Sequence, residues 1–410
     1  MTAERWAWMR EQTPVMQQLT YLNSGWSGPL SYPVVEAMQR RITLELERGP
    51  TTREVTDDRA ALIAAMRERT AEMLGADATE ITVTGNTTEG LNLVTNGLAI
   101  ERGDRIITTS VEHSSGMVPA YYLRERRGAE VAIVPIAAGD SVGAILESFA
   151  ATIGDRARLV ILSEISYSTG QLLPLKEIVE LAHRAGAVVV VDGAQTAGQI
   201  PIDVRASNVD FYAVPSHKWL CGPDGLGALY VREDLIATLE PPKVAGRAAV
   251  SWDFEGGFEP QRELITKYEL TTVSGALIAG TVAALDQYLK SGPQAVFDRA
   301  RELTRHAEQR FEGIDRVTVT SPRSDEARTG LFCFHTEGLP ASALSMYLQQ
   351  EAGVVCRAVK DYDTVRLSLH VFNDEADIER TAIAVEQAVS DGIPQEIVEA
   401  AAARAAGMQG

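Results

Sequence analysis

Cysteine is scarce in this sequence, and the three residues present lie far apart. Cys221, Cys333 and Cys356 form neither an even disulfide set nor a C-x-x-C pair of the kind that binds a metal. The sequence therefore predicts no disulfide framework and no metal site. We expect a cytoplasmic protein whose thiols are reduced and buried.

Long apolar runs and positive charge are also lacking. The longest apolar runs, such as residues 187–191, fall far below the ~20 residues of a membrane helix. The N-terminus carries early charges and no apolar h-region, so no signal peptide is predicted. Lys and Arg number 38 against 56 Asp and Glu, a net charge of -18. This balance argues against nucleic acids and anionic membranes as partners.

The 410 residues, 45% of them hydrophobic and 23% charged, are typical of a globular chain of two or three domains. Strand-like runs are followed by helical patterns at 89–99, 118–127 and 175–185. The runs fall at 81–84, 105–109, 131–135, 159–163, 187–191, 211–214 and 227–231. This alternation predicts an α/β fold with a mostly parallel sheet, whose catalytic groups gather at the carboxyl ends of the strands.

The pattern changes from about residue 276, where long helices dominate. Helices are predicted at 276–289, 294–312, 341–351 and 375–389, and short strands at 331–335, 354–357 and 364–369. We therefore divide the chain into an N-terminal segment (1–30) that contributes to the active site, a large domain (31–275) and a smaller α+β domain (276–410).

Asp192 directly follows the run of four valines that predicts a doubly buried strand. It could cap the next helix. It could equally be a carboxylate held in a water-poor cleft to pair with a buried cation. Alone, this residue does not decide between the two.

Lys218 comes soon after the buried strand at 211–214, behind Ser216 and His217. Lysine is seldom buried unless it is paired or reactive. A desolvated lysine has a depressed pKa and can form a Schiff base. The other five lysines lie in surroundings predicted to face solvent: Lys176, Lys243, Lys267, Lys290 and Lys360.

The segment 84–90, TGNTTEG, joins a predicted strand to a predicted helix. The hydroxyls of Thr87 and Thr88 would stand at the helix N-terminus, where free N–H groups favour an anion. The segment matches neither G-x-x-x-x-G-K-[ST] nor G-x-G-x-x-G, which excludes a nucleotide P-loop and a dinucleotide fingerprint. A monophosphate fits better, although a plain capping motif explains the segment equally well.

His113 also follows a strand and opens a helix, as a polar cap or as an imidazole stacked on a planar cofactor ring. With the lysine, the carboxylate and the phosphate cup it completes the set that pyridoxal phosphate needs. The aldehyde requires a lysine, and the pyridine nitrogen requires a carboxylate that keeps it protonated.

These residues lie in stretches that resemble fold-type I pyridoxal-phosphate enzymes of aminotransferase class V. That group includes cysteine desulfurases, cysteine/cystine C–S lyases and isopenicillin-N epimerase-like proteins. The matching stretches are YLNSGWSGPL, TGNTTEGLN, TSVEHSS, VVVDGAQTAGQIPIDV, SHKWLCGPDGLGALY and VRLSLHVFN. They follow the family's order over nearly the whole chain, and the resemblance makes 31–275 the cofactor-binding domain.

The resemblance implies a role for each residue around the cofactor. Lys218 would bind the aldehyde and move protons, Asp192 would pair with the pyridine nitrogen, and His113 would stack on the ring. The remaining cofactor contacts implied are Gln195 to the phenolic oxygen and Thr87, Thr88, Ser216 and His217 to the phosphate. A homodimer with shared active sites is implied as well, in which Thr271 or Thr272 reaches the phosphate of the partner subunit.

The resemblance also implies a substrate pocket for a small amino acid. Arg366 would hold the substrate carboxylate through two hydrogen bonds. Arg357 and Asn23 are further pocket candidates. Trp26 would line the entrance, unless it belongs to the core or an interface. We expect Trp219 to pack beneath the cofactor loop.

The sequence departs from the desulfurases at one point. Those enzymes carry a nucleophilic Cys on a mobile loop before the arginine strand, whereas residues 358–363 here contain none. Cys356 neighbours Arg357 in the predicted strand 354–357, so the two side chains should point to opposite faces. If Arg357 faces the cofactor, Cys356 faces the core.

The missing Cys favours reactions that need no protein thiol. The leading hypothesis is a C–S (β-elimination) lyase on cysteine, cystine or a cysteine conjugate. An epimerase or aminotransferase shares the first proton abstraction, and a desulfurase could use a non-standard Cys. A catalytically silent binding protein is the alternative from another class, and the intact set of Lys218, Asp192 and His113 argues against it.

Overall fold

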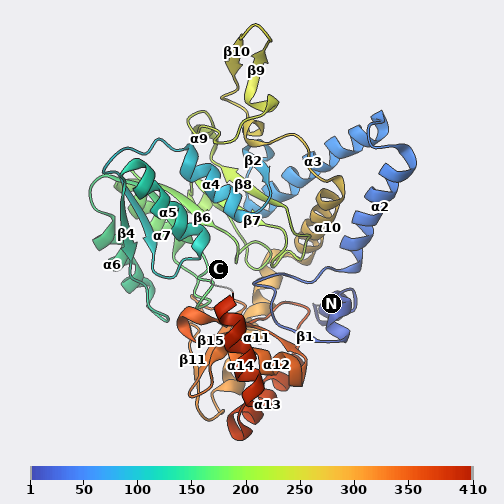
Figure 1. Ribbon diagram of the computed structural model, residues 1–410, viewed down its shortest axis with the longest axis vertical. Helices are drawn as coiled ribbons and strands as arrows, with labels where there is room; N and C mark the ends of the chain where they lie inside the picture. The colour runs from blue at the N-terminus through green and yellow to red at the C-terminus, as the bar shows by residue number, and fades with distance from the viewer. Residues whose placement is uncertain (1, 408–410) are drawn as a thin grey trace.

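The computed structural model describes residues 2–407 (Figure 1). Its central sheet has seven strands in the order β2-β8-β7-β6-β5-β3-β4. Their bounds are β2 (Ile81–Thr84), β3 (Arg105–Thr109), β4 (Glu130–Val134), β5 (Ala157–Ser163), β6 (Val188–Asp192), β7 (Phe211–Pro215) and β8 (Gly227–Val231). β8 runs antiparallel to both of its neighbours, β2 and β7, and the other strand pairs of the sheet are parallel. The predicted α/β fold with a mostly parallel sheet is confirmed.

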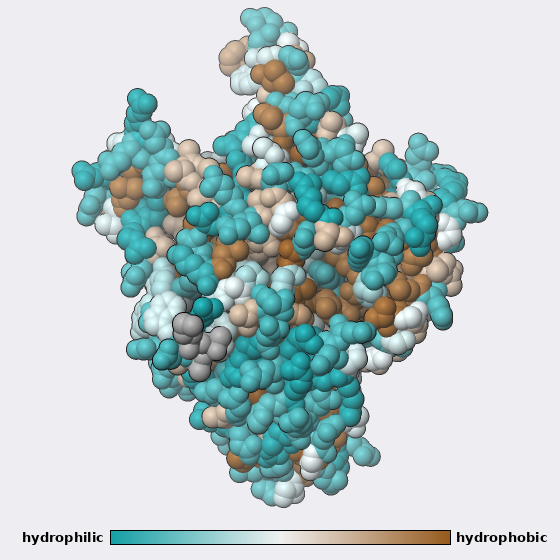
Figure 2. All heavy atoms as spheres, turned by 180° about the vertical axis from the view of Figure 1, so that it is seen from behind, coloured by the Kyte–Doolittle hydropathy of each residue, from teal (hydrophilic) through white to brown (hydrophobic). Residues whose placement is uncertain are grey.

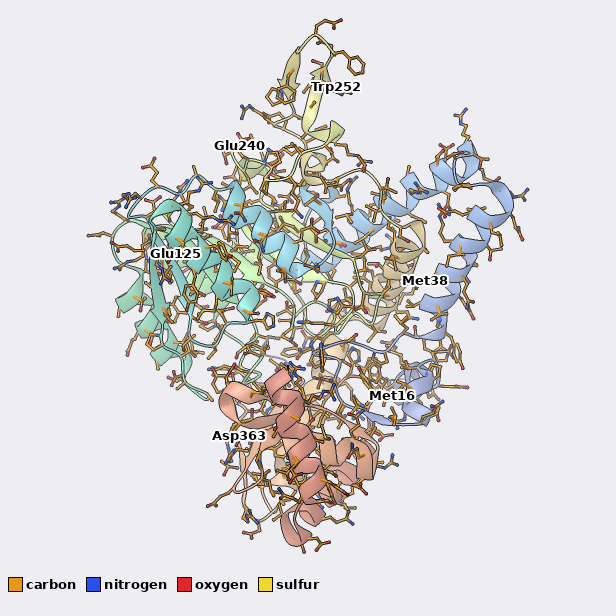
Figure 3. The ribbon with its side chains drawn as sticks, in the orientation of Figure 1. Met16, Met38, Glu125, Glu240, Trp252 and Asp363 are labelled. Carbon is orange, nitrogen blue, oxygen red and sulfur yellow. The ribbon has the colours of Figure 1, made fainter. Side chains whose placement is uncertain are left out.

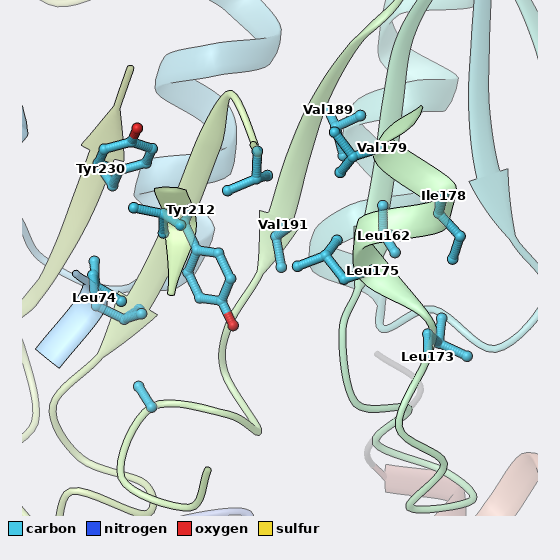
Figure 4. Close-up of a cluster of buried hydrophobic side chains, with 14 of the residues drawn as sticks. Leu74, Leu162, Leu173, Leu175, Ile178, Val179, Val189, Val191, Tyr212 and Tyr230 are labelled. Atoms are coloured by element: carbon cyan, nitrogen blue, oxygen red, sulfur yellow. The ribbon is translucent and has the colours of Figure 1, made fainter. Parts of the chain in front are cut away.

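Helices cover both faces of this sheet. One face carries α4 (Thr87–Gly97) and α5 (Ser114–Arg127). The other carries α3 (Arg53–Leu74), α6 (Val142–Ile153), α7 (Leu175–Arg184) and α10 (Gly275–Ser291). Consecutive valines of β6 pack into opposite layers, Val189 and Val191 into the second (Figure 4) and Val190 into the first. Burial on both faces explains why β6 is an unbroken apolar run.

A four-stranded antiparallel sheet forms the lower part of Figure 1, in the order β11-β12-β15-β14. Its strands are β11 (Val317–Val319), β12 (Leu331–Thr336), β14 (Arg357–Val359) and β15 (Thr364–Ser368). The helices around it are α11 (Pro293–Phe311), α12 (Ala341–Ala352), α13 (Glu375–Asp391) and α14 (Gln395–Gly407). This part is largely hydrophilic on the face seen in Figure 2.

The N-terminal segment joins the two sheets. After α1 (Thr2–Glu11), β1 (Thr20–Tyr21) pairs in parallel with β13 (Val354–Val355), and Asn23 bridges Ser368. The prediction of one strand over 354–357 is therefore wrong. Residues 354–355 pair with β1, whereas β14 begins at Arg357 and pairs with β15.

Several elements lie outside the predicted ones, including α1, α3, α6 and β11, and so do a further helix and a hairpin. Helix α2 (Tyr32–Arg48) packs with α3 and α10. A hairpin of β9 (Ala249–Trp252) and β10 (Phe258–Pro260) projects from the top of the molecule (Figures 1 and 3). Two short helices complete the fold, α8 (Val204–Ser207) and α9 (Glu233–Ile236). Within residues 2–407, no helix combines the length and apolarity needed to cross a membrane.

Candidate active site

A cavity of about 350 Å³ opens where the carboxyl ends of β5, β6 and β7 meet the small sheet. Sixteen residues from both sheets and the N-terminal segment line it. They are Gly25, Trp26, Asn86, Thr87, Thr88, His113, Ser115, Ser163, Tyr167, Asp192, Ala194, Gln195, His217, Lys218, Arg357 and Arg366. Ten of the thirteen residues predicted for the site are among them.

Lys218 lies in the turn between β7 and β8. The turn is closed by the Cys221 N–H to the Lys218 carbonyl (3.0 Å) and by the Gly222 N–H to the Ser216 carbonyl (2.9 Å). Burial lowers the pKa of Lys218 to about 8; Asp192 opposes this shift, and the charge of Arg366 adds to it. The Lys218 amine therefore loses its proton closer to neutral pH than an ordinary lysine does.

Lys267 is the exception among the lysines predicted to face solvent, because it is almost fully buried. Its Nζ donates to the carbonyls of Ile236 (2.5 Å) and Arg262 (2.8 Å). No hydrogen bond or ion pair engages the Lys218 amine in the part of the chain described. Burial alone therefore does not distinguish a structural lysine from a reactive one. The difference is that the Lys267 amine donates hydrogen bonds to two carbonyls, whereas the Lys218 amine has no such acceptor among the described residues.

Asp192 ends β6 and is buried beside Ser163, its partner on β5. Its Oδ1 accepts the Ala194 N–H at 2.9 Å, while the side chain also lines the cavity. The carboxylate offers negative charge to the cavity, whereas the helix-cap interpretation is wrong: Asp192 stabilises a turn, and the next helix, α8, is capped by Asp203.

His113 is the polar cap that one of its two interpretations predicts, and stacking on a cofactor ring stays a prediction. It caps α5, with Nδ1 accepting the Ser115 N–H at 3.2 Å, and its ring lines the cavity. Tyr167 packs edge-on against the imidazole, with ring centroids 5.3 Å apart. Desolvation, and then the charge of Lys218, lower the pKa of His113. A neutral ring suits stacking on a planar group.

The N-terminus of α4 provides an anion site. Asn86 caps the helix, and its Oδ1 accepts the Glu89 N–H at 2.9 Å. Thr87 Oγ1 and His217 Nδ1 are buried and make no hydrogen bond within residues 2–407. Two such groups beside free helix N–H groups fit a phosphate, which would supply the missing acceptors.

Gln195 connects the cavity to the lysine turn. Its Nε2 donates to the Gly25 carbonyl at 2.8 Å, and its Oε1 accepts the Trp219 indole N–H at 2.9 Å. Trp219 is buried below the turn, as its position after Lys218 predicts. The amide of Gln195 is thereby fixed at the cavity wall.

Two arginines enter the cavity from the small sheet. Arg366 is buried and donates to the Tyr167 carbonyl at 2.8 Å, while its Nε has no partner within residues 2–407. Burial lowers the pKa of Arg366 to about 10. The Arg357 guanidinium lies 4.0 Å from the centre of the Trp26 ring. The two guanidinium groups suit an anionic part of a substrate.

Three predicted residues do not reach this cavity. The Ser216 hydroxyl instead donates to the Pro223 carbonyl. Asn23 is buried outside the cavity lining and forms the bridge to Ser368. Thr272 is exposed, like Thr271, in the segment before α10. The Ser216 hydroxyl already donates its hydrogen bond within the turn. The role implied for Thr272 requires a second subunit.

Tyr167 and Ser163 line the cavity but were not predicted. Ser163 is the last residue of β5, and Tyr167 follows it closely. The rule that functional groups lie at carboxyl strand ends, which singled out Asp192, also applies to β5. Both side chains are uncharged, so neither stands out in the sequence as an unusual charge at a strand end.

None of the three cysteines faces the cavity. Cys356 packs in the core of the small sheet, with its Sγ 3.6 Å from Ser345 Oγ. Burial raises the pKa of its thiol to about 12. Cys221 and Cys333 are buried too. The segment after β14 carries Tyr362, whose hydroxyl reaches the Ser110 carbonyl at 3.4 Å.

Comparisons with known proteins cover most of the chain. A sequence model described as aminotransferase class-V matches residues 20–381. A probable cysteine desulfurase of Methanothermobacter thermautotrophicus is 28% identical over 403 residues, 94% of this chain and 98% of that protein. The solved structure of the cystine C–S lyase C-DES with its reaction product cysteine persulfide is 29% identical (TM-score 0.84), covering 92% and 99% of the two chains. The apo cysteine desulfurase from Thermococcus onnurineus NA1 is 26% identical (TM-score 0.86), covering 93% and 98%.

Proposed function

The chain belongs to the aminotransferase class-V family and is a pyridoxal-phosphate-dependent enzyme, and from this premise we propose that it is a C–S lyase. Its substrate would be cysteine, cystine or a cysteine conjugate, from which the sulfur on Cβ is eliminated. The observation that carries the proposal is the cavity itself, whose described lining contains no thiol. Persulfide formation on the protein needs a thiol there, and β-elimination does not.

The residues present fit the cofactor. Thr87, Thr88 and His217 would hold its phosphate, and Asp192 would face its pyridine nitrogen. The bound cofactor supplies an electron sink for the negative charge that develops at the substrate Cα. The Lys218 amine would hold the cofactor and then, once released, remove the Cα proton as a general base.

The substrate would be oriented from the small sheet. Arg366 would bind its carboxylate, and its burial keeps water from competing for the guanidinium. Arg357 lies beside it, stacked on Trp26. A substrate held in this way presents Cα to Lys218 and its Cβ sulfur to the cavity. Loss of the Cα proton and departure of the sulfur would then give, after hydrolysis, pyruvate and ammonia, together with sulfide from cysteine, a persulfide from cystine or a thiol from a conjugate.

The assay is pyruvate and sulfide or persulfide release by the holoenzyme from L-cystine, L-cysteine and an S-alkyl cysteine. The Lys218→Ala variant is the control for release without the enzyme's amine. Pyruvate from cystine or the conjugate supports the lyase. Loss of Cα deuterium without a keto product points instead to an epimerase, and an oxo acid with the aminated cofactor points to an aminotransferase.

A desulfurase with a non-standard Cys is tested separately. A variant with Cys221, Cys333 and Cys356 all changed to serine should keep its activity if no protein thiol takes part. Alanine formed from cysteine by the wild type, and lost in this variant, would establish the desulfurase. If the Lys218→Ala variant kept full biological function, the result would favour the alternative of a catalytically silent binding protein.

A further inference from the structure

His370 is a buried histidine that none of the steps above employs. It lies two residues beyond β15 and four beyond Arg366, and only 5% of it is exposed. Its ring stands against Trp219, the residue that follows Lys218. One side chain of the small-sheet region thus touches the turn that carries the reactive lysine.

Hydrogen bonds define the state of this imidazole. Nδ1 accepts the Val371 N–H at 2.8 Å, and Nε2 lies 2.9 Å from the Trp219 carbonyl. Since a carbonyl only accepts, Nε2 carries the proton and the ring is neutral. Burial lowers the pKa of His370 to about 4, so this state persists across the physiological range.

Two aromatic rings lie nearly parallel to the imidazole. Phe372 stacks on it with centroids 4.4 Å apart and planes at 10°, and Trp219 lies 5.7 Å away at 21°. A phenylalanine would fill this space without the desolvation cost of an imidazole. What histidine adds here is the N–H that binds the Trp219 carbonyl.

Trp219 is consequently fixed at two points. Its carbonyl accepts from His370, and its indole N–H donates to Gln195 at 2.9 Å. Both anchors are on the residue that follows Lys218, and the peptide joining the two residues is held as well, because the Lys218 carbonyl accepts the Cys221 N–H at 3.0 Å. The orientation of this peptide sets the direction in which the Lys218 side chain leaves the backbone.

We propose that His370 is a positioning residue for Lys218, acting through the Trp219 carbonyl. It joins the strand that carries Arg366 to the turn that carries the lysine, so the substrate clamp and the amine keep one relative position. This inference rests on the proposed role of Lys218.

The test compares two substitutions that separate the hydrogen bond from the packing. His370→Phe keeps an aromatic ring and removes the Nε2 donor, together with the Nδ1 acceptor of the Val371 N–H. His370→Gln keeps a donor at similar reach and removes the stack. The first readout is the pH midpoint of the visible absorbance band of the bound cofactor, which depends on how the lysine nitrogen is held. The second is the rate at which cofactor is lost on dilution.

We expect His370→Phe to move the midpoint by at least about half a pH unit, roughly threefold in the equilibrium, and to speed cofactor loss. His370→Gln should stay near wild type in both. Phe332→Leu, in the small-sheet core away from the turn, is the control for a general loss of stability. An unmoved midpoint in His370→Phe, or an equal shift in Phe332→Leu or His370→Gln, would overturn the inference.

Failure of the Lys218 assignment would look different. In that case Lys218→Ala would retain a visible band that borohydride reduces, whatever the His370 variants do. A band lost in Lys218→Ala leaves the His370 measurements as a test of positioning alone.

Discussion

Arg357 and Arg366 lie directly opposite each other in the antiparallel pair β14–β15. Both side chains line the cavity, and no acidic side chain forms an ion pair with either in the described chain. Like charges directly across a strand pair are destabilising. The charge of Arg357 also contributes to the lowered pKa of Arg366. A bound anion would relieve this repulsion, as expected of a site for an amino-acid carboxylate.

The first prediction follows from this pair. A small carboxylate such as propionate should raise the melting temperature of the protein, because a ligand that binds only the folded state stabilises it. Arg366→Met should abolish the increment. Arg328→Met is the matched control, because Arg328 is equally buried but already paired with Glu308. An increment that survives in Arg366→Met would place the anion elsewhere.

Lys218 gives a prediction on pH. Only the unprotonated amine attacks an aldehyde, and its pKa is lowered to about 8. The rate at which the cofactor-free protein takes up pyridoxal phosphate should therefore rise about tenfold from pH 7 to pH 9 and then level off. Stopped-flow absorbance at a series of pH values measures this. A rate still rising steeply above pH 9.5 would indicate an ordinary lysine.

Thr87 gives a prediction on cofactor affinity. Thr87→Val removes a buried hydroxyl that has no hydrogen-bond partner within residues 2–407. It should weaken pyridoxal-phosphate binding about tenfold, the equivalent of one hydrogen bond to a charged group, and leave pyridoxal binding unchanged. Thr95→Val is the control, because Thr95 is an equally buried residue of α4 whose hydroxyl also lacks a partner but lies outside the cavity. Equal effects of the two variants would exclude a phosphate contact.

Glu164 predicts a change of stability with pH. It follows β5, its carboxylate accepts the Tyr212 hydroxyl, and burial raises its pKa to about 7. Because the folded pKa lies above the unfolded value, the contribution of Glu164 is complete below about pH 4.5 and is lost as the pH rises through 7. Between pH 5 and pH 8 the free energy of unfolding should fall by about 2 kcal/mol more in the wild type than in Glu164→Gln. Urea titrations at the two pH values check this, and parallel losses would contradict it.

A mixed dimer tests whether the active sites are shared. If Thr272 serves the phosphate of the partner subunit, a dimer of one Lys218→Ala chain and one Thr272→Val chain contains one intact site. If Thr272 serves its own chain, neither site of the mixed dimer is intact. Cofactor titration of the purified mixed dimer would show one high-affinity site in the first case and none in the second, and an unchanged affinity of the Thr272→Val homodimer would show that Thr272 contacts neither phosphate. A monomeric protein in sedimentation would contradict the homodimer itself.

The strands of the large sheet could be predicted closely because each is a short apolar run whose burial on both faces leaves a plain signal. β2, β3 and β8 begin and end where predicted. The gathering of the four groups at one cavity could be predicted too, because each lies at or soon after the end of a strand, whereas their roles toward a cofactor stay predictions. The hairpin β9–β10 was missed because its aromatic residues, such as Phe254, are exposed and follow no core pattern.

The remaining errors have a common physical origin, which is contact between segments distant in the chain. The strand 354–357 divides because β1 pairs with its first half. Lys267 can be buried because its amine donates hydrogen bonds to the carbonyls of Ile236 and Arg262. The Ser216 side chain does not line the cavity because its hydroxyl donates to the Pro223 carbonyl. None of these partners can be recognised from the local sequence.

The burial of every cysteine makes this chain a ready background for site-specific labelling. Burial raises the pKa of the Cys221, Cys333 and Cys356 thiols to about 12, 11 and 12, so thiolate is nearly absent at neutral pH. A maleimide probe should leave the native protein largely unmodified. A single cysteine introduced at an exposed position, such as Leu46 on α2 (82% exposed), would then report distances and motions without removal of any native residue.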